Sequence, residues 1–177
     1  MRTRRQFLAG AMGVSAVALL SPIPAAEAAR SSGAAEAGIN RVLILKKRRL
    51  LRLMQDHLIV KEYRVALGRN PIGHKEREGD GRTPEGHYHI AWRNPESAFH
   101  LSLNISYPSQ ADREAAAARG VNPGGLIMIH GQPNRVAGKP YVKRWGDWTD
   151  GCVAVQNHEM EEIWRLVPDF TPVEIRA

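Results

Sequence analysis

The sequence of 177 residues contains one cysteine, Cys152, in the stretch Thr149-Asp150-Gly151-Cys152. A thiol with a pKa of about 8.5 becomes a strong nucleophile when a neighbouring base or cation helps it to ionise. The glycine before the cysteine permits a tight turn and close approach of a substrate. Backbone N–H groups near the cysteine can bind an oxyanion. A buried structural cysteine is the alternative, but the polar residues before Cys152 disfavour it.

The histidine best placed to assist this thiol is His130, one of seven histidines in the chain. It ends the apolar run Leu126-Ile127-Met128-Ile129 and precedes Gly131. A histidine at the end of a buried strand is held in place while its ring faces a cleft. There it can take the thiol proton and later return it to a leaving amine.

A zinc site is the competing interpretation of the histidines. His87 and His89 are two positions apart in an expected strand, so both rings face one side and can share a metal ion. A third ligand is needed, for which His100 is available, and no carboxylate at ligand spacing stands out. We therefore expect neither a metal nor another cofactor, and a zinc-dependent wall peptidase stays open as an alternative.

The elements that position these residues follow from the alternation of polar and apolar side chains, which predicts strands joined by Gly- and Pro-rich loops. The strands are expected at residues 41–46, 49–54, 58–67, 85–92, 99–105, 125–130, 152–155 and 171–175, and the helices at 111–119 and 157–166. Asn157 is expected to cap the second helix, whose apolar face contains Met160, Ile163, Trp164 and Val167. The basic run Lys46-Lys47-Arg48-Arg49 is expected to be a solvated turn. The pattern predicts a mainly β, largely antiparallel domain with two short helices.

The N-terminus has the order of segments found in an export signal. Arg4-Arg5 precede an uncharged apolar stretch at residues 7–20, and Ala26-Glu27-Ala28 fits a cleavage site. The paired arginines resemble a twin-arginine signal. We expect a signal peptide at residues 1–28, a flexible lead-in at 29–39 and a catalytic domain at 40–177. An uncleaved anchor is the alternative.

The composition limits the partners. The formal net charge is +7, which attracts polyanions such as nucleic acid, an acidic membrane face or an anionic cell wall. No Lys/Arg-rich block is interleaved with aromatic residues, so we expect no nucleic-acid partner. After removal of the signal no stretch long enough for a stable membrane span remains. The expected location is therefore extracytoplasmic, in the periplasm.

The residues singled out above resemble the L,D-transpeptidase catalytic domain, also called the YkuD domain. His130-Gly131 is followed 22 positions later by Cys152, at the end of a Ser/Thr-x-Gly-Cys pattern. The segment at residues 78–88 also resembles the family, and the likeness covers roughly residues 40–177. The combination of motifs is specific, whereas each motif alone is weak.

This resemblance implies a β-rich catalytic domain that is like a sandwich or barrel, and it implies a mechanism. Cys152 is the nucleophile, His130 the base, and the Gly131 carbonyl orients the imidazole, while the N–H groups of Gly151 and Cys152 hold the oxyanion. The partner is the peptidoglycan stem tetrapeptide: D-Ala leaves, a thioester forms, and an amine of a second stem resolves it to a 3-3 cross-link.

The sequence departs from the family pattern at two positions, with Asp150 where histidine is common and Ala154 where arginine or asparagine is common. Arg144 is a candidate replacement for the missing cation. The substrate contacts are expected from Arg144, Trp145, Trp148, Thr149 and Asp150. A hydrolytic carboxypeptidase or amidase with the same cysteine remains open, as does a wall-binding module without turnover.

Overall fold

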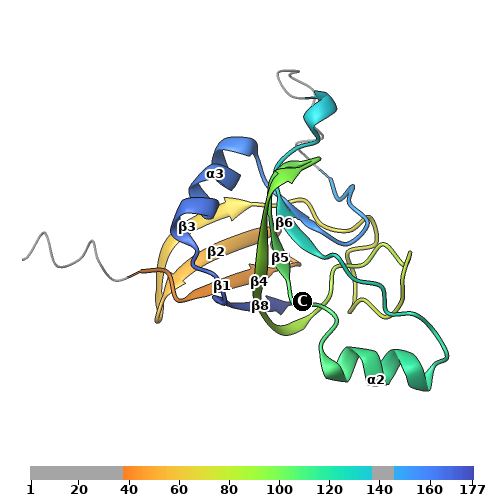
Figure 1. Cartoon of the computed structure of the whole chain (residues 1–177). Coiled ribbons are helices and arrows are strands. Elements are labelled where there is room, and N and C mark those ends of the chain that lie inside the picture. The colour runs from red at the N-terminus through yellow and green to blue at the C-terminus, as the bar shows by residue number, and fades with distance from the viewer. Residues whose placement is uncertain (1–37, 137–145) are drawn as a thin grey trace, which may run out of the picture. The chain divides into compact units, whose positions relative to one another are not determined.

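Among residues 38–136 and 146–177, which this computed structural model describes, eight strands form one bent sheet (Figure 1). The order across the sheet is β3-β2-β1-β8-β4-β5-β6-β7. The strands are β1 (Arg41–Leu45), β2 (Leu50–Gln55), β3 (Leu58–Arg64), β4 (Gly86–Ser97), β5 (His100–Ile105), β6 (Met128–His130), β7 (Val153–Ala154) and β8 (Pro172–Arg176). The helices are α2 (Gln110–Ala118) and α3 (Asn157–Leu166), with a short 3-10 helix at Asn134–Val136.

The sheet curls back on itself, as the predicted barrel-like class requires. The long strand β4 pairs with β8 through residues 86–89 and with β5 from Ile90 onward, so it belongs to both halves of the sheet. Ala66, just after β3, pairs with Ala154 of β7 at the other end of the strand order. Five strand pairs are antiparallel, whereas β1–β8 and β6–β7 are parallel. The prediction of a mainly β, largely antiparallel fold is confirmed.

The helix α3 covers the core with the apolar face expected from its spacing. Met160, Ile163 and Val167 are fully buried, and Trp164 packs against the same cluster while partly exposed. The predicted cap is wrong by one residue. Gln156 is the cap residue, and its N–H donates to the Glu159 carboxylate at 2.8 Å. The side-chain oxygen of Asn157 instead accepts a hydrogen bond from the Gln132 N–H at 2.7 Å.

Several predicted boundaries also differ. β3 ends at Arg64 rather than at residue 67, and β4 continues to Ser97 rather than ending at residue 92. β6 starts at Met128 rather than at residue 125, because Leu126 has a φ of 53°, in the left-handed region that a strand cannot contain. Ile39, assigned to the flexible lead-in, is buried in the core at 6% exposure. Residues 29–37 of that lead-in and the expected signal peptide lie outside the described residues. No helix in the described ranges is both long and apolar enough to cross a membrane.

The basic run forms the turn between β1 and β2, but its first lysine is not solvated as predicted. Lys46 is 2% exposed. Its ammonium donates to the carbonyl oxygens of Gly73 and Thr83, at 2.6 and 2.8 Å, and to a carboxylate oxygen of Glu85 at 2.7 Å. Burial lowers the pKa of Lys46, although the Glu85 carboxylate opposes this shift. These bonds tie the loop at residues 68–84 to the sheet.

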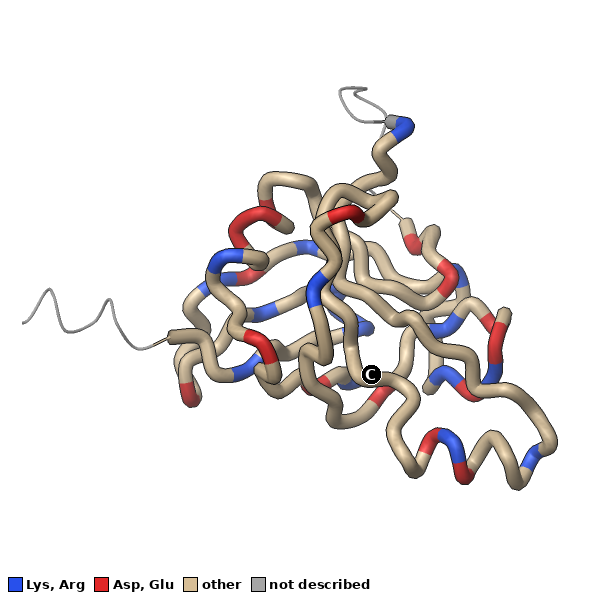
Figure 2. The backbone as a smooth tube through the Cα atoms, in the orientation of Figure 1, with Lys and Arg blue, Asp and Glu red and all other residues tan. Residues whose placement is uncertain are grey.

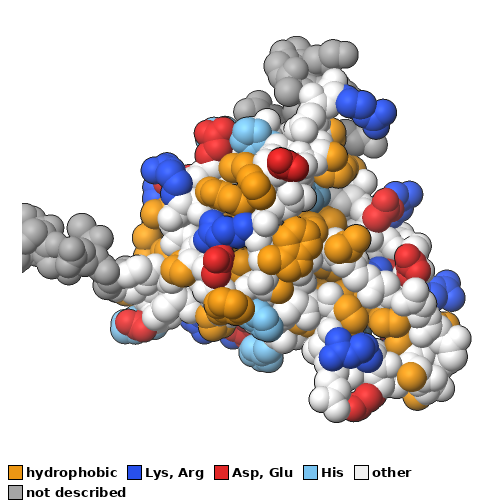
Figure 3. All heavy atoms as spheres, viewed as in Figure 1, with side chains coloured by type: hydrophobic (Ala, Val, Ile, Leu, Met, Phe, Trp, Pro, Cys, Tyr) orange, Lys and Arg blue, Asp and Glu red, His pale blue; other side chains and the backbone are white. Residues whose placement is uncertain are grey.

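Acidic and basic residues are interspersed along α2 and the neighbouring loop, as the tube in Figure 2 shows. Large apolar side chains are also exposed, among them Trp92, Leu126 and Phe170. On the face in Figure 3, apolar side chains gather near the middle.

The Lys46 contacts predict a loss of stability on truncation. Lys46→Ala leaves the Glu85 carboxylate and two carbonyl groups without their partner, so the free energy of unfolding should fall by about 3 kcal/mol. The exposed neighbour provides the control: Lys47→Ala should change it by less than about 0.5 kcal/mol. Urea denaturation measures both, and equal effects would contradict the structural role of Lys46.

Candidate active site

Cys152 and His130 line one cavity of about 340 Å³. β6 and β7 run in parallel, with Ile129 opposite Val153 and His130 opposite Ala154. Because side chains alternate along a strand, Met128 and His130 face the same side. The Met128 N–H donates to the sulfur of Cys152 at 3.4 Å, so both predicted catalytic side chains reach the same cavity. Its other lining residues are Asn94, Ser97, Ala98, Phe99, Ser102, Leu126, Met128, Trp148, Thr149 and Asp150.

The imidazole of His130 is held in one orientation. Its Nδ1 lies 2.7 Å from the Gly131 carbonyl oxygen. A carbonyl only accepts, so Nδ1 carries the proton and Nε2 is the basic atom. The rings of Phe99 and Trp148 lie 4.6 and 5.8 Å from the imidazole, centroid to centroid. Burial lowers the pKa of His130, although the hydrogen bond to Gly131 opposes this shift, so the ring is neutral at neutral pH.

The thiol of Cys152 is also neutral at rest. Burial raises its pKa, the Met128 N–H lowers it, and the nearby Asp150 carboxylate raises it again. The sulfur lies 3.5 Å from the Leu126 carbonyl oxygen, to which the S–H donates. The site therefore contains a neutral thiol and a neutral imidazole rather than a resting ion pair.

Thr149 shapes the turn before the cysteine. Its hydroxyl donates to the Cys152 carbonyl at 2.7 Å and accepts from the Gly151 N–H at 3.1 Å. Gly151 has a φ of 134°, and a Cβ there would lie 2.7 Å from the Arg82 carbonyl oxygen, so no larger residue fits. The N–H of Gly151, an expected oxyanion donor, is thus occupied by Thr149 in this structure.

Asp147 and Arg49 anchor the same loop, through a contact that no motif in the sequence indicated. The Asp147 carboxylate accepts from the Arg49 guanidinium at 2.7 Å and from the Leu67 N–H at 2.9 Å. Thr149 adds two backbone bonds, to the Leu67 carbonyl at 3.1 Å and from the Arg69 N–H at 2.9 Å. Since Arg49 and Asp147 are 98 positions apart, no local spacing indicates the pair.

The expected substrate contacts fall into two groups. Trp148, Thr149 and Asp150 line the cavity, and Asp150 is exposed and paired with Arg69. Arg144 and Trp145 lie outside the described residues. The Trp148 indole Nε1 is buried and has no hydrogen-bond partner among the described residues.

Ala154 is buried at 2% exposure and exchanges backbone hydrogen bonds with Ala66. Its methyl group supplies no charge where family members commonly have arginine or asparagine.

The histidines of the zinc alternative are not brought together. His87 and His89 are exposed on β4, and the His100 imidazole pairs with Glu161 at 2.9 Å. Within the described ranges, no three His, Cys, Asp or Glu side chains lie close enough to share a metal ion.

Comparisons with known proteins agree with the predicted family and fold. The family model of the L,D-transpeptidase catalytic domain matches residues 39–175. The L,D-transpeptidase-family protein YafK of Escherichia coli (strain K12) is 29% identical over 133 residues, which are 71% of this chain and 46% of YafK. The chain thus spans about half the length of this curated relative.

Solved structures show the same fold. The helical cell shape determining protein Pgp2 of Campylobacter jejuni (K307A mutant) is 28% identical with a TM-score of 0.61, over 80% of this chain and 48% of Pgp2. Bd1075 of Bdellovibrio bacteriovorus is 24% identical with a TM-score of 0.55, over 80% of this chain and 49% of Bd1075. The second likeness concerns the fold alone.

The neutral pair predicts the pH dependence of Cys152 alkylation by iodoacetamide. Because burial raises the thiol pKa, the rate should rise with pH through a midpoint above about 8.5, the value of a free thiol. Asp150→Asn removes a charge that favours the protonated thiol, so its midpoint should be lower. A wild-type midpoint near 7 or below would instead indicate a resting thiolate and imidazolium.

The loop anchor predicts graded losses of stability. Asp147→Ala removes the acceptor of both the Arg49 guanidinium and the Leu67 N–H, so the free energy of unfolding should fall by roughly 2 kcal/mol. Asp147→Asn keeps an oxygen for the Leu67 N–H, so it should lower the free energy of unfolding by less than Asp147→Ala does. Thermal or urea unfolding measures the series, and no difference between Asp147→Ala and wild type would remove the anchor from the account.

Proposed function

Because the chain belongs to the L,D-transpeptidase catalytic domain family, we propose that it is a cysteine-dependent acyltransferase acting on peptidoglycan stem tetrapeptides. The observation that supports this most is the meeting of Cys152 and His130 in one cavity, with Nδ1 of His130 fixed by the Gly131 carbonyl. That arrangement makes Nε2 the basic atom of the ring.

In the first step, Nε2 of His130 takes the Cys152 proton while the sulfur attacks the carbonyl carbon that precedes the terminal D-Ala. The C–N bond breaks, the imidazolium gives its proton to the leaving amine, and D-Ala departs to leave a thioester. Since both groups start neutral, charge develops only during the attack. The Cys152 N–H stabilises the oxyanion, and the Gly151 N–H joins it after exchanging its bond to the Thr149 hydroxyl.

In the second step, an amine of another stem attacks the thioester and forms a 3-3 cross-link, which restores the thiol. Water in place of the amine gives a hydrolytic L,D-carboxypeptidase with the same acyl-enzyme. The substrate is reached outside the cytoplasm, after export by the signal at residues 1–28, and no cofactor takes part. The Campylobacter relative is a helical cell shape determining protein, and we extend a role in wall shape to this chain.

Release of D-Ala from a purified disaccharide-tetrapeptide tests this proposal. Cys152→Ala should abolish release, because the thioester cannot form. His130→Ala should slow it about a hundredfold or more, through loss of the general base. The exposed His57 in the turn between β2 and β3 is the matched control, and His57→Ala should keep the wild-type rate.

The product mass identifies the acceptor. A cross-linked dimer indicates transfer to an amine, and disaccharide-tripeptide alone indicates hydrolysis. Release that persists in Cys152→Ala, or that a chelator abolishes, would contradict a cysteine mechanism and favour the zinc alternative. Binding to the wall without any release would indicate a module without turnover.

A further inference from the structure

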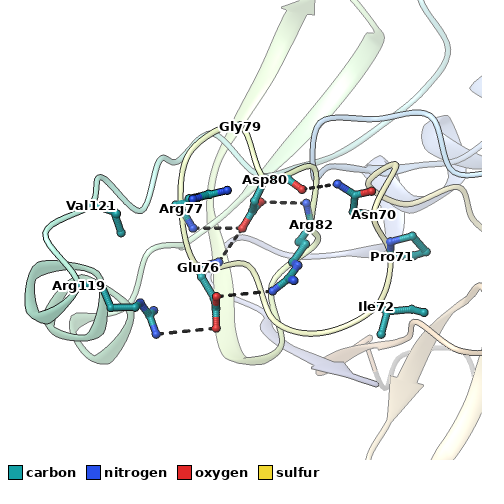
Figure 4. A pocket seen from close by; sticks show the side chains of 10 residues that line it. All are labelled: Asn70, Pro71, Ile72, Glu76, Arg77, Gly79, Asp80, Arg82, Arg119 and Val121. Atoms are coloured by element: carbon teal, nitrogen blue, oxygen red, sulfur yellow. Dashed lines mark hydrogen bonds and ion pairs between the residues drawn. The ribbon is translucent and has the colours of Figure 1, made fainter.

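A second cavity of about 760 Å³ lies between the loop at residues 68–84 and the end of α2 (Figure 4). It shares no lining residue with the cavity of Cys152 and His130. Three arginines, Arg77, Arg82 and Arg119, come together here from two separate segments. We call this cavity the arginine pocket.

Glu76 is a weakly held internal anion in the arginine pocket. Figure 4 shows the side chains of Arg82 and Arg119 approaching its carboxylate from different sides. The nitrogen–oxygen distances are 3.6 and 3.8 Å, which are longer than good hydrogen bonds. Glu76 is also about half exposed, at 48%. A carboxylate from outside can therefore replace it and make shorter contacts.

The second acidic residue of the arginine pocket, Asp80, is an ionised carboxylate whose charge is already compensated by hydrogen-bond donors of the protein. Its carboxylate accepts from the N–H groups of Glu76, Arg77 and Arg82 and from the Lys75 ammonium. Burial alone would raise the pKa of Asp80, but these bonds outweigh it and lower the pKa to about 2. Three guanidinium groups thus remain against one exchangeable carboxylate, which leaves an excess of positive charge.

The walls of the arginine pocket favour a peptide over a phosphate polymer. Pro71, Ile72 and Val121 line it beside the charged groups, and Ile72 is 86% exposed. Burying such a side chain requires an apolar group on the ligand. A peptide offers carboxylates together with aliphatic side chains, whereas a phosphate polymer offers little apolar surface.

The arginine pocket adjoins the loop that carries the nucleophile. The Arg82 carbonyl lies directly against Gly151, 2.7 Å from where a Cβ would be. Arg69, which precedes the pocket residue Asn70, is paired with Asp150. A peptide held in the arginine pocket is therefore bound beside the segment at residues 150–152.

We propose that the arginine pocket binds a carboxylate of a wall peptide next to the catalytic cavity, with the ligand carboxylate replacing Glu76 between Arg82 and Arg119. The identity of the peptide rests on the proposed function, but the carboxylate site does not. Arg77 supplies the third positive charge, and the apolar wall receives a small side chain of the peptide.

Binding of a synthetic D-Ala-terminated tetrapeptide to the full chain carrying Cys152→Ala, measured by calorimetry, tests this proposal without turnover. Arg77→Gln and Arg119→Gln should each weaken binding about tenfold, by loss of one charge-assisted contact. Glu76→Gln should strengthen it, since it removes the competing carboxylate. Arg48→Gln, an equal charge change at an exposed turn position, should have no effect. The same peptide with its carboxylates amidated should not respond to any of these changes.

Weaker binding in Glu76→Gln, or equal binding in Arg119→Gln and Arg48→Gln, would overturn the carboxylate site. Variants that lose affinity for inorganic phosphate but not for the peptide would overturn it in favour of a phosphate site.

The alkylation rate of Cys152 should stay unchanged in the arginine variants with the cysteine intact, which confirms their fold. If the binding pattern holds while wild type releases no D-Ala, the proposed function fails and the arginine pocket stands. If D-Ala is released while the arginine variants bind normally, only the arginine pocket fails.

Discussion

The Asp147 carboxylate links the loop that carries Cys152 to two residues far away in the sequence, the Arg49 guanidinium in the turn between β1 and β2 and the Leu67 N–H just after β3. β7, which follows Cys152, has only two residues and cannot by itself fix the position of a side chain. The backbone bonds of Thr149 to Leu67 and Arg69 continue the same connection. Cys152 is therefore positioned by its anchored loop on one side and by the Met128 N–H on the other.

The burial that positions the two proposed catalytic groups, His130 and Cys152, also disfavours their charged forms. Phe99 and Trp148 pack against the imidazole, and burial disfavours the ionised forms of both His130 and Cys152. A protonated thiol is less reactive toward oxidants and alkylating agents than a thiolate. For an enzyme proposed to work outside the cytoplasm, a thiol that ionises only as it attacks is protected between turnovers.

The parts of this site that the sequence predicted are those encoded locally. The apolar run before His130, the following Gly131 and the turn before Cys152 each lie within a few residues, and alternation placed the strands. The contacts that hold the site together join residues far apart, as Arg49 and Asp147 do across 98 positions. Such pairs leave no periodic pattern. Lys46 was assigned to a solvated turn for the same reason, since its partners lie 27 to 39 positions away.

The central claim is that Cys152 carries the acyl group during turnover. Rapid acid quenching of the wild type with disaccharide-tetrapeptide, followed by proteolysis and mass mapping, locates that group. The account predicts an adduct equal to the substrate minus D-Ala, on the peptide that contains Cys152 and removable by hydroxylamine as a thioester is. Release of D-Ala at the full rate with no adduct on Cys152, or with the adduct on another residue, would contradict it.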